Sequence, residues 1–180
     1  MDLEEIRGVL NLYPVLLDSH SWDLFDELFT QDVEADYAGG QMHWFDLASF
    51  KRDFARLHEG MAGHQHLLGT PQVVIEGDRA FALTHGRWNV FRASPAVEPM
   101  DLSEGGAWYD DELVRTAAGW RVRRRVARNF WRRGTKPEEG APPLAVDSFP
   151  EWARTGRVGY LNALRRRRNR DPATAAAPLA

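Results

Sequence analysis

Hydrophobic residues recur at helical spacing through the first third of the chain. They fall three or four positions apart up to Leu17, which predicts a helix over residues 2–18. A second apolar stripe predicts a short helix that begins at Ser21, and a third predicts a helix over residues 46–60. Between these two, residues 33–37 alternate apolar with acidic side chains, as in a short strand.

From residue 72 onward the period of the pattern is two. Residues 72–92 predict a hairpin that turns at Gly77 and Asp78, and residues 106–131 predict a second hairpin that turns at residues 116–119. Helices followed by antiparallel strands are typical of an α+β fold, here with three N-terminal helices on one side of an antiparallel sheet.

The composition changes after residue 133, where proline and arginine become frequent. We predict one domain over residues 1–133, because 180 residues are enough for one well-filled core. Residues 134–180 would form an extension with a short helix within residues 152–164 and a disordered end from Asp171.

Charge and cysteine content narrow the function classes. The chain has no cysteine, which excludes disulfides, thiolate metal sites and cysteine nucleophiles. Its formal net charge of -3 gives no global field that would attract nucleic acid or an anionic membrane. No apolar run approaches the roughly 18 residues that span a bilayer, and the chain does not begin with a basic segment followed by an apolar one. We therefore expect a cytoplasmic protein with neither nucleic acid nor membrane as a partner.

Aromatic residues are more plentiful than the core stripes need. The chain has seven Trp, nine Phe and four Tyr. Such an excess is typical of a pocket for a flat or apolar ligand, and additional core packing is the alternative explanation.

Asp18 lies at the edge of the apolar stripe of the first helix. A carboxylate held there is partly desolvated, so it needs a partner or a raised pKa. The alternative is that Asp18 caps the second helix or binds nearby backbone amides.

His85 falls on the face of its strand that carries Phe81 and Leu83, while the alternate positions are small. The small face suits close helix packing, and the large apolar face with one imidazole is the arrangement expected of a pocket wall. A hydrogen-bonded core histidine is the alternative.

His64 and His66 form a His-x-His pair, which raises the possibility of a metal site. A metal also needs further ligands, usually a carboxylate, and the next acidic residue, Glu76, is too distant for a compact site. We expect neither a metal nor another cofactor, since the chain also has no phosphate-binding loop and no dinucleotide fingerprint.

Residues 121–133 contain a run of arginines that suggests nucleic-acid binding at first sight. Across the predicted hairpin, however, Asp110, Asp111 and Glu112 fall opposite residues 123–125. Cross-strand pairing of opposite charges explains much of the run without a nucleic-acid partner.

Several segments together resemble one family. They are residues 17–23, 28–37, 65–69, 76–80 and 119–122. In their order and spacing the chain resembles the SnoaL-like proteins of the nuclear transport factor 2-like superfamily, over about residues 1–133. The resemblance implies a cone-shaped α+β barrel.

Within that superfamily, the segments around Asp18, Tyr37, His66 and His85 are most similar to scytalone dehydratase and related dehydratases. The similarity implies that Asp18, His66 and His85 are catalytic and that Tyr37 positions substrate or a water. Trp22, Tyr109 and Asn129 are further candidates for substrate contact. The residue before the aspartate is aromatic in scytalone dehydratase and is Leu17 here.

Two imidazoles tuned by a buried carboxylate can both take and deliver a proton near neutral pH. We therefore expect a cofactor-independent lyase or isomerase with dehydratase-like chemistry on an apolar hydroxylated cyclic metabolite, such as a polyketide or steroid-like compound. A polyketide cyclase that mainly shapes its substrate and a non-catalytic ligand-binding protein remain alternatives. Apolar outer strands favour a homodimer.

Overall fold

The computed structural model describes residues 1–92, 102–134 and 145–170. Its helices are α1 (Asp2–Asp18), α2 (Leu47–Leu57), α3 (Phe149–Arg154) and α4 (Gly159–Arg170), with 3-10 turns η1 (Trp22–Glu27) and η2 (Ala38–Gly40). Its strands are β1 (Phe29–Tyr37), β2 (Met42–Trp44), β3 (Met61–Leu68), β4 (Gln72–Glu76), β5 (Arg79–Arg92), β6 (Leu102–Thr116) and β7 (Gly119–Gly134). The predicted disordered end from Asp171 lies outside these ranges.

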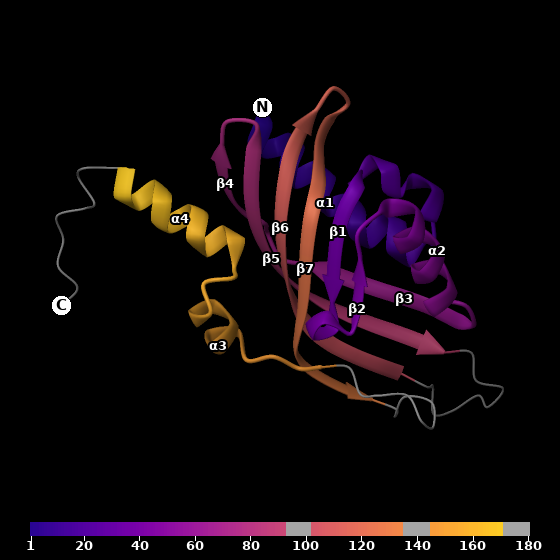
Figure 1. Cartoon of the computed structure of the whole chain (residues 1–180). Helices are drawn as coiled ribbons and strands as arrows, with labels where there is room; N and C mark the ends of the chain where they lie inside the picture. The colour runs from indigo at the N-terminus through magenta and orange to yellow at the C-terminus, as the bar shows by residue number, and fades with distance from the viewer. Residues whose placement is uncertain (93–101, 135–144, 171–180) are drawn as a thin grey trace.

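The seven strands form one curved sheet that does not close into a barrel (Figure 1). Their order is β2-β1-β7-β6-β5-β3, and β4 pairs with β5 beside β3. The neighbours are antiparallel except β1 and β7, which pair in parallel. The α+β class is thus confirmed, and one of the three predicted N-terminal helices is a 3-10 turn, η1.

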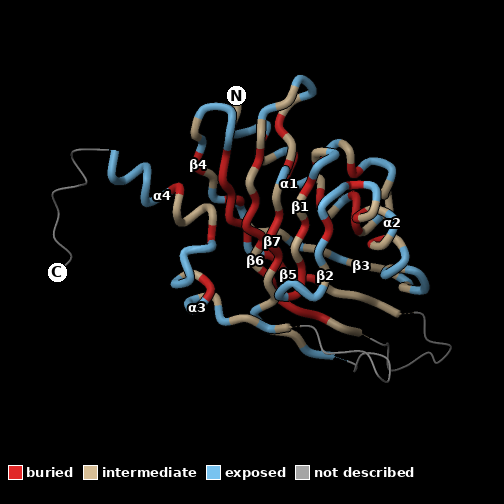
Figure 2. Tube along the Cα trace, viewed as in Figure 1, coloured by how far each residue is buried: buried red, intermediate tan, exposed pale blue. Residues whose placement is uncertain are grey.

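The helices cover both faces of the sheet. The inner face packs on α1, η1 and α2, and the outer face carries α3 and α4 (Figure 1). The buried segments run along the central strands between these layers (Figure 2). No helix among the described residues is long and apolar enough to cross a membrane.

Small residues on β5 allow the inner helices to approach closely. Ala80 and Ala82 are fully buried in the main core cluster with Ile6 and Leu10 of α1. The side chains of the alternate positions, Phe81 and Leu83, point to the outer face because successive residues of a strand alternate.

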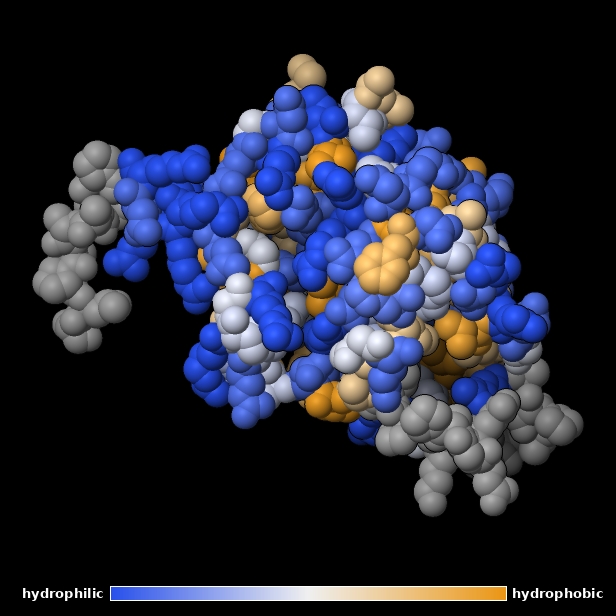
Figure 3. Space-filling view, in the orientation of Figure 1, coloured by the Kyte–Doolittle hydropathy of each residue, from blue (hydrophilic) through white to orange (hydrophobic). Residues whose placement is uncertain are grey.

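The C-terminal helices dock on this outer face. Trp152 and Val158 are buried against Leu83 and Val126, and the ring of Phe149 stacks on Trp108 with 4.2 Å between centroids. On the side seen in Figure 3, α4 presents an almost entirely hydrophilic surface to solvent. The division into a domain at residues 1–133 and an extension stays a prediction.

The arginine run of β7 is paired with carboxylates, but more often with those of β1 than with those across the hairpin. Of the three predicted partners, Asp111 forms an ion pair with the run, whereas Glu112 pairs with Arg79 of β5 and Asp110 faces Val126. In the register of β6 and β7, Asp111 faces Arg125 and Glu112 faces Arg124. Arg124 also lies 3.3 Å from Glu34 of β1, and Arg128 binds Asp36 at 2.6 Å. Further ion pairs join Arg121 to Glu27, Arg123 to Asp32 and Arg133 to Glu104, so ion pairs within the chain account for most of the run.

Candidate functional site

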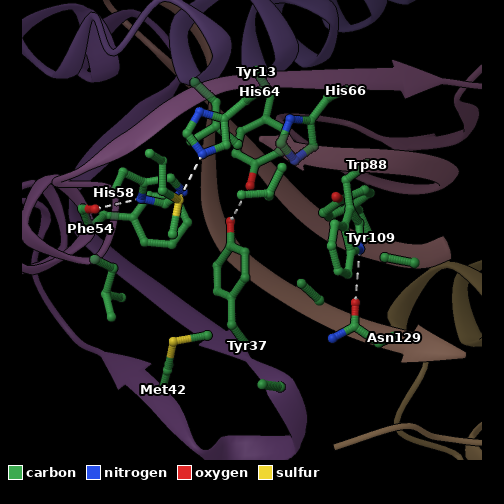
Figure 4. A pocket seen from close by; sticks show the side chains of 17 residues that line it. Tyr13, Tyr37, Met42, Phe54, His58, His64, His66, Trp88, Tyr109 and Asn129 are labelled. Atoms are coloured by element: carbon green, nitrogen blue, oxygen red, sulfur yellow. Dashed lines mark hydrogen bonds between the residues drawn. The ribbon is translucent and has the colours of Figure 1, made fainter. Parts of the chain in front are cut away.

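The concave side of the sheet encloses an elongated pocket of about 230 Å³ (Figure 4). The walls are mostly apolar, and the polar side chains that line them are few. The lining residues are Tyr13, Leu17, Tyr37, Ala38, Met42, Phe54, Leu57, His58, Met61, His64, His66, Trp88, Val90, Ala107, Tyr109, Ala127 and Asn129. An apolar cavity with a few convergent polar groups is typical of a small-molecule site.

Asp18 and His66 form the best-defined polar contact beside the pocket. Asp18 is the last residue of α1, and its Oδ1 lies 2.6 Å from Nδ1 of His66 on β3. Its other oxygen, Oδ2, accepts a hydrogen bond from the backbone amide of His66 at 2.8 Å. The same carboxylate therefore fixes both the ring and the strand that carries it.

This contact keeps Asp18 ionised and selects the tautomer of His66. Burial raises the pKa of Asp18, but the hydrogen bonds from the ring and amide of His66 outweigh it and bring that pKa below its ordinary value. The carboxylate is therefore ionised and accepts the Nδ1 proton. With Nδ1 as the donor to Asp18, the lone pair of the imidazole is on Nε2, where it can act as a base toward a molecule in the pocket.

Three buried tyrosines line the pocket close to one another. The hydroxyl of Tyr37 donates to that of Tyr13 at 3.3 Å, and the ring of Tyr109 lies edge-on to Tyr13 at 5.5 Å. Burial is the main reason that the pKa of each tyrosine is raised. All three therefore keep their hydroxyl protons at neutral pH and can serve as hydrogen-bond donors.

Asn129 lies at another part of the wall, beside Trp88 (Figure 4). Its Oδ1 accepts a hydrogen bond from the indole Nε1 of Trp88 at 3.2 Å. That bond orients the amide and leaves its NH₂ group as a donor for a ligand. The structure thus places Tyr37, Tyr109 and Asn129 in the pocket with His66.

His85 does not lie in this pocket, so its predicted place in the pocket wall is wrong. Its side chain is on the outer face of β5, where its ring lies 5.2 Å from Trp108, and it lines a separate shallow hollow with Leu67 and Phe130. The small residues of β5 face inward because α1 packs against them, so the odd-numbered positions face outward. The large face that the sequence suggested as a pocket wall is instead covered in part by α3 and α4.

Trp22 belongs to the layer behind the pocket and not to its lining. Its ring lies 5.3 Å from that of His58 and 6.0 Å from that of Phe54, both of which line the cavity. Trp22 therefore packs behind the wall of the cavity. It is not among the lining residues, so this position does not favour the predicted direct contact with substrate.

Sequence reasoning missed two polar residues of the lining, Tyr13 and His58. Tyr13 lies on the apolar stripe of the helix predicted over residues 2–18, and in α1 it is buried on that stripe. His58 follows Phe54 by four residues and so continues the apolar stripe of α2, a signal that could have placed it on the inner side. His64 was noticed only as a possible metal ligand. Among the described residues, no group of three His, Asp or Glu side chains is arranged to hold a metal ion.

Comparison with known proteins supports this description of the fold. The model of the SnoaL-like domain family matches residues 1–126. An uncharacterized protein of Mycobacterium tuberculosis is 32% identical over 128 residues, which cover 69% of this chain and 83% of that protein.

Solved structures show the same architecture. A protein of Kribbella flavida superimposes with a TM-score of 0.68 at 23% identity, covering 73% of this chain and 93% of that one. A candidate scytalone dehydratase of Novosphingobium aromaticivorans superimposes with a TM-score of 0.59 at 17% identity, covering 77% and 94%. With the family model matching more than two thirds of its length, the chain belongs to the SnoaL-like domain family.

Proposed function

We propose that this protein is a cofactor-independent lyase that eliminates water from an apolar hydroxylated cyclic metabolite. The observation that carries the proposal is the 2.6 Å contact between His66 and the ionised Asp18 at the wall of an apolar cavity. The similarity in fold to a candidate scytalone dehydratase is consistent with it.

In the proposed reaction, Nε2 of His66 removes a proton from a carbon next to a carbonyl group of the substrate. The electrons of that C–H bond form a double bond to the neighbouring carbon, whose hydroxyl group departs. The imidazolium returns its proton to the departing hydroxyl, which leaves as water, so the enzyme ends in its starting state. Asp18 stabilises the imidazolium between the two transfers and holds the ring in the required tautomer.

The remaining polar groups of the pocket would bind the substrate and stabilise the enolate. The NH₂ group of Asn129 and the hydroxyl of Tyr13, which accepts from Tyr37 and keeps its own proton, are donors that a carbonyl oxygen can accept from. A hydrogen-bond donor directed at the developing negative charge stabilises the transition state more strongly in a water-poor cavity than in water. The apolar walls would hold the ring system of a polyketide or steroid-like compound.

The test begins with a panel of cyclic β-hydroxyketones, in which water loss creates a conjugated enone that absorbs in the ultraviolet. The variants His66→Ala and Asp18→Asn should lower kcat by about 100- to 10,000-fold, as expected for removal of a general base or of its orienting group. His85→Ala is the matched control, because it removes an imidazole from the outer face of the same sheet and should leave kcat within about twofold.

Retained turnover in both His66→Ala and Asp18→Asn would contradict the proposal. A loss of only a few-fold in each would favour a cyclase that acts by shaping its substrate. Ligand binding without conversion of any panel member would favour a non-catalytic binding protein.

We also propose that two copies pair through the part of the outer face that α3 and α4 leave open. This part includes Leu67, which is 58% exposed, and Phe130, which is 37% exposed. Light scattering on the full chain measures the oligomeric state directly, and a monomer at all accessible concentrations would contradict pairing. The cytoplasmic location remains a prediction from the sequence.

A further inference from the structure

His58 and His64 lie at the end of the pocket that is away from Asn129 (Figure 4), and His20 forms a cluster of three imidazoles with them. The ring centroids of His58 and His64 are 4.8 Å apart, those of His20 and His64 are 4.9 Å apart, and those of His20 and His58 are 6.0 Å apart. His58 and His64 line the cavity, whereas His20 lies behind them. The proposed elimination uses none of these rings.

The hydrogen bonds of these rings determine which nitrogen remains for a ligand. His64 has both nitrogens engaged, with Nδ1 at 2.9 Å from Nε2 of His20 and Nε2 at 3.0 Å from Sδ of Met61. His58 has only one bond among the described residues, from Nδ1 to the backbone carbonyl of Phe54 at 2.6 Å. Because a carbonyl only accepts, Nδ1 carries the proton and Nε2, on the opposite edge of the ring, carries a lone pair.

His58 stays neutral at physiological pH. Burial is the main cause that lowers its pKa to about 4, and the neighbouring rings of His20 and His66 add to this effect. A neutral imidazole with its proton fixed on Nδ1 is a hydrogen-bond acceptor at Nε2 and is too weak an acid to deliver a proton. Its chemistry therefore differs from that of His66, although both rings are anchored through Nδ1.

We propose that Nε2 of His58 accepts a hydrogen bond from a second hydroxyl group of the substrate, one that the product retains. This inference rests on the proposed function for the reaction, and it adds the substrate class: a ring compound with a spectator hydroxyl at the end opposite its carbonyl. The spectator hydroxyl is not the leaving group, because a departing hydroxyl must receive a proton and His58 offers none. His58 is thus a specificity-determining residue.

A pair of inert probes tests the contact by binding alone. β-Naphthol and its methyl ether have the same bicyclic body, and only β-naphthol can donate to Nε2. Calorimetric titration of the full chain should show β-naphthol binding about three- to tenfold more tightly, the range expected for one neutral hydrogen bond. In His58→Phe, which keeps a flat ring and removes the acceptor, the two dissociation constants should become equal.

Two further variants complete the design. His43→Phe makes the same substitution on β2 outside the pocket, where His43 pairs with Glu34, and should preserve the preference. His58→Gln supplies a carbonyl oxygen as an acceptor and should recover part of the preference for β-naphthol over its ether. Should His58→Phe fail to fold, the wild-type ¹⁵N resonance of Nε2 serves instead, because it should shift on addition of β-naphthol and not on addition of the ether.

Equal affinity of the wild type for both probes, failure of both to bind, or a preference that survives in His58→Phe would each overturn the proposal. None of these results depends on turnover. A failed hydroxyl preference is therefore distinguishable from a failed elimination reaction, which the His66 and Asp18 variants report.

Discussion

Arg125 and Asp111 form a bidentate ion pair in the interior, beside the tyrosines that line the pocket. Nε of Arg125 lies 2.7 Å from Oδ1 of Asp111, and Nη2 lies 2.9 Å from Oδ2. The guanidinium also lies over the ring of Tyr13, at 4.3 Å from its centroid. Both charged side chains are at most 2% exposed, so the attraction between the two charges offsets the hydration that each of them loses on folding.

Removing one partner of this pair should strongly destabilise the fold. Asp111→Asn leaves a buried guanidinium without its counter-charge, and we expect the free energy of unfolding to fall by about 3–5 kcal/mol. Urea denaturation followed by tryptophan fluorescence measures the change. Glu112→Gln is the neighbouring control; its partner Arg79 is 58% exposed, and the expected loss is below about 1 kcal/mol. Similar losses in both variants would contradict the assignment.

The histidine cluster should make the protein acid-sensitive. Burial lowers the pKa of His58 and of His64 to about 4, whereas an unfolded histidine titrates near 6.5. Between pH 4 and pH 6.5 these histidines bind protons in the unfolded chain but not in the folded chain. The free energy of unfolding therefore decreases as the pH falls from about 6.5 to 4. After allowance for solvent screening at these partly exposed rings we expect a loss on the order of 1–3 kcal/mol.

Denaturant titrations at a series of pH values measure this loss. Replacing both rings, in His58→Phe with His64→Phe, should flatten the dependence in this range. A slope that is unchanged in the double variant would refute the assignment to these two residues.

Asp110 should act with the opposite sign. Burial is the main cause that raises its pKa to about 6, above the ordinary 3.8, despite the hydrogen bonds that it accepts from the amides of Gly159 and Tyr160. Its contribution to stability is therefore present below about pH 4 and is lost as the pH rises through 6. Between pH 6.5 and 4 the variant Asp110→Asn should lose more stability than the wild type.

The same pH series measures this difference. Asp32→Asn, at a surface position that is 67% exposed, should follow the wild-type curve. An Asp110→Asn curve parallel to that of the wild type would show that this carboxyl does not titrate in the range.

Gly105 is predicted to control the shape of the pocket wall. A Cβ at this position would lie 2.4 Å from Cζ2 of Trp88 and 2.9 Å from the backbone oxygen of Trp131. Gly105→Ala should therefore displace the indole that binds Asn129, lower the free energy of unfolding by about 1–3 kcal/mol and weaken β-naphthol binding. Gly63→Ala, whose nearest contact would be 3.8 Å, should change neither quantity appreciably. Equal behaviour of the two variants would argue against a packing constraint at Trp88.

Local signals in the sequence identified most of the elements. The helix over residues 2–18 and the turns at Gly77 and at residues 116–119 follow from short-range periodicity and turn chemistry, and each is present in the structure. A regular hairpin would place Asp111 opposite Arg124, and the register shift between Glu112 and Leu113 places it opposite Arg125 instead.

The pairing of strands that are distant in the sequence could not be predicted from the local sequence pattern. Strand β3 has no clean alternation, because Gly63, His64 and Gln65 interrupt the apolar positions, and its extended form comes from its ladder with β5. The parallel pairing of β1 with β7 is likewise set by the whole fold. The contact between Asp18 and His66, 48 residues apart, was expected only from the family resemblance.

The placement of His85 failed for a different reason. Alternation along β5 separates its two faces correctly, but residue size alone does not tell which face is concave. Helix α1 selects the small face by packing on it, and this information lies outside the strand.

The docking of α4 on a carboxylate of β6 has a consequence for how such a protein can change over time. The outer sheet surface is occupied by the chain's own C-terminal part, whose anchor at Asp110 lies on the side of the sheet opposite the pocket. Mutations in residues 145–170 can therefore uncover or cover that surface without changing a residue that lines the cavity. The proposed pairing of two copies and the proposed ligand site depend on different residues of the chain, so either could change during evolution while the other is conserved.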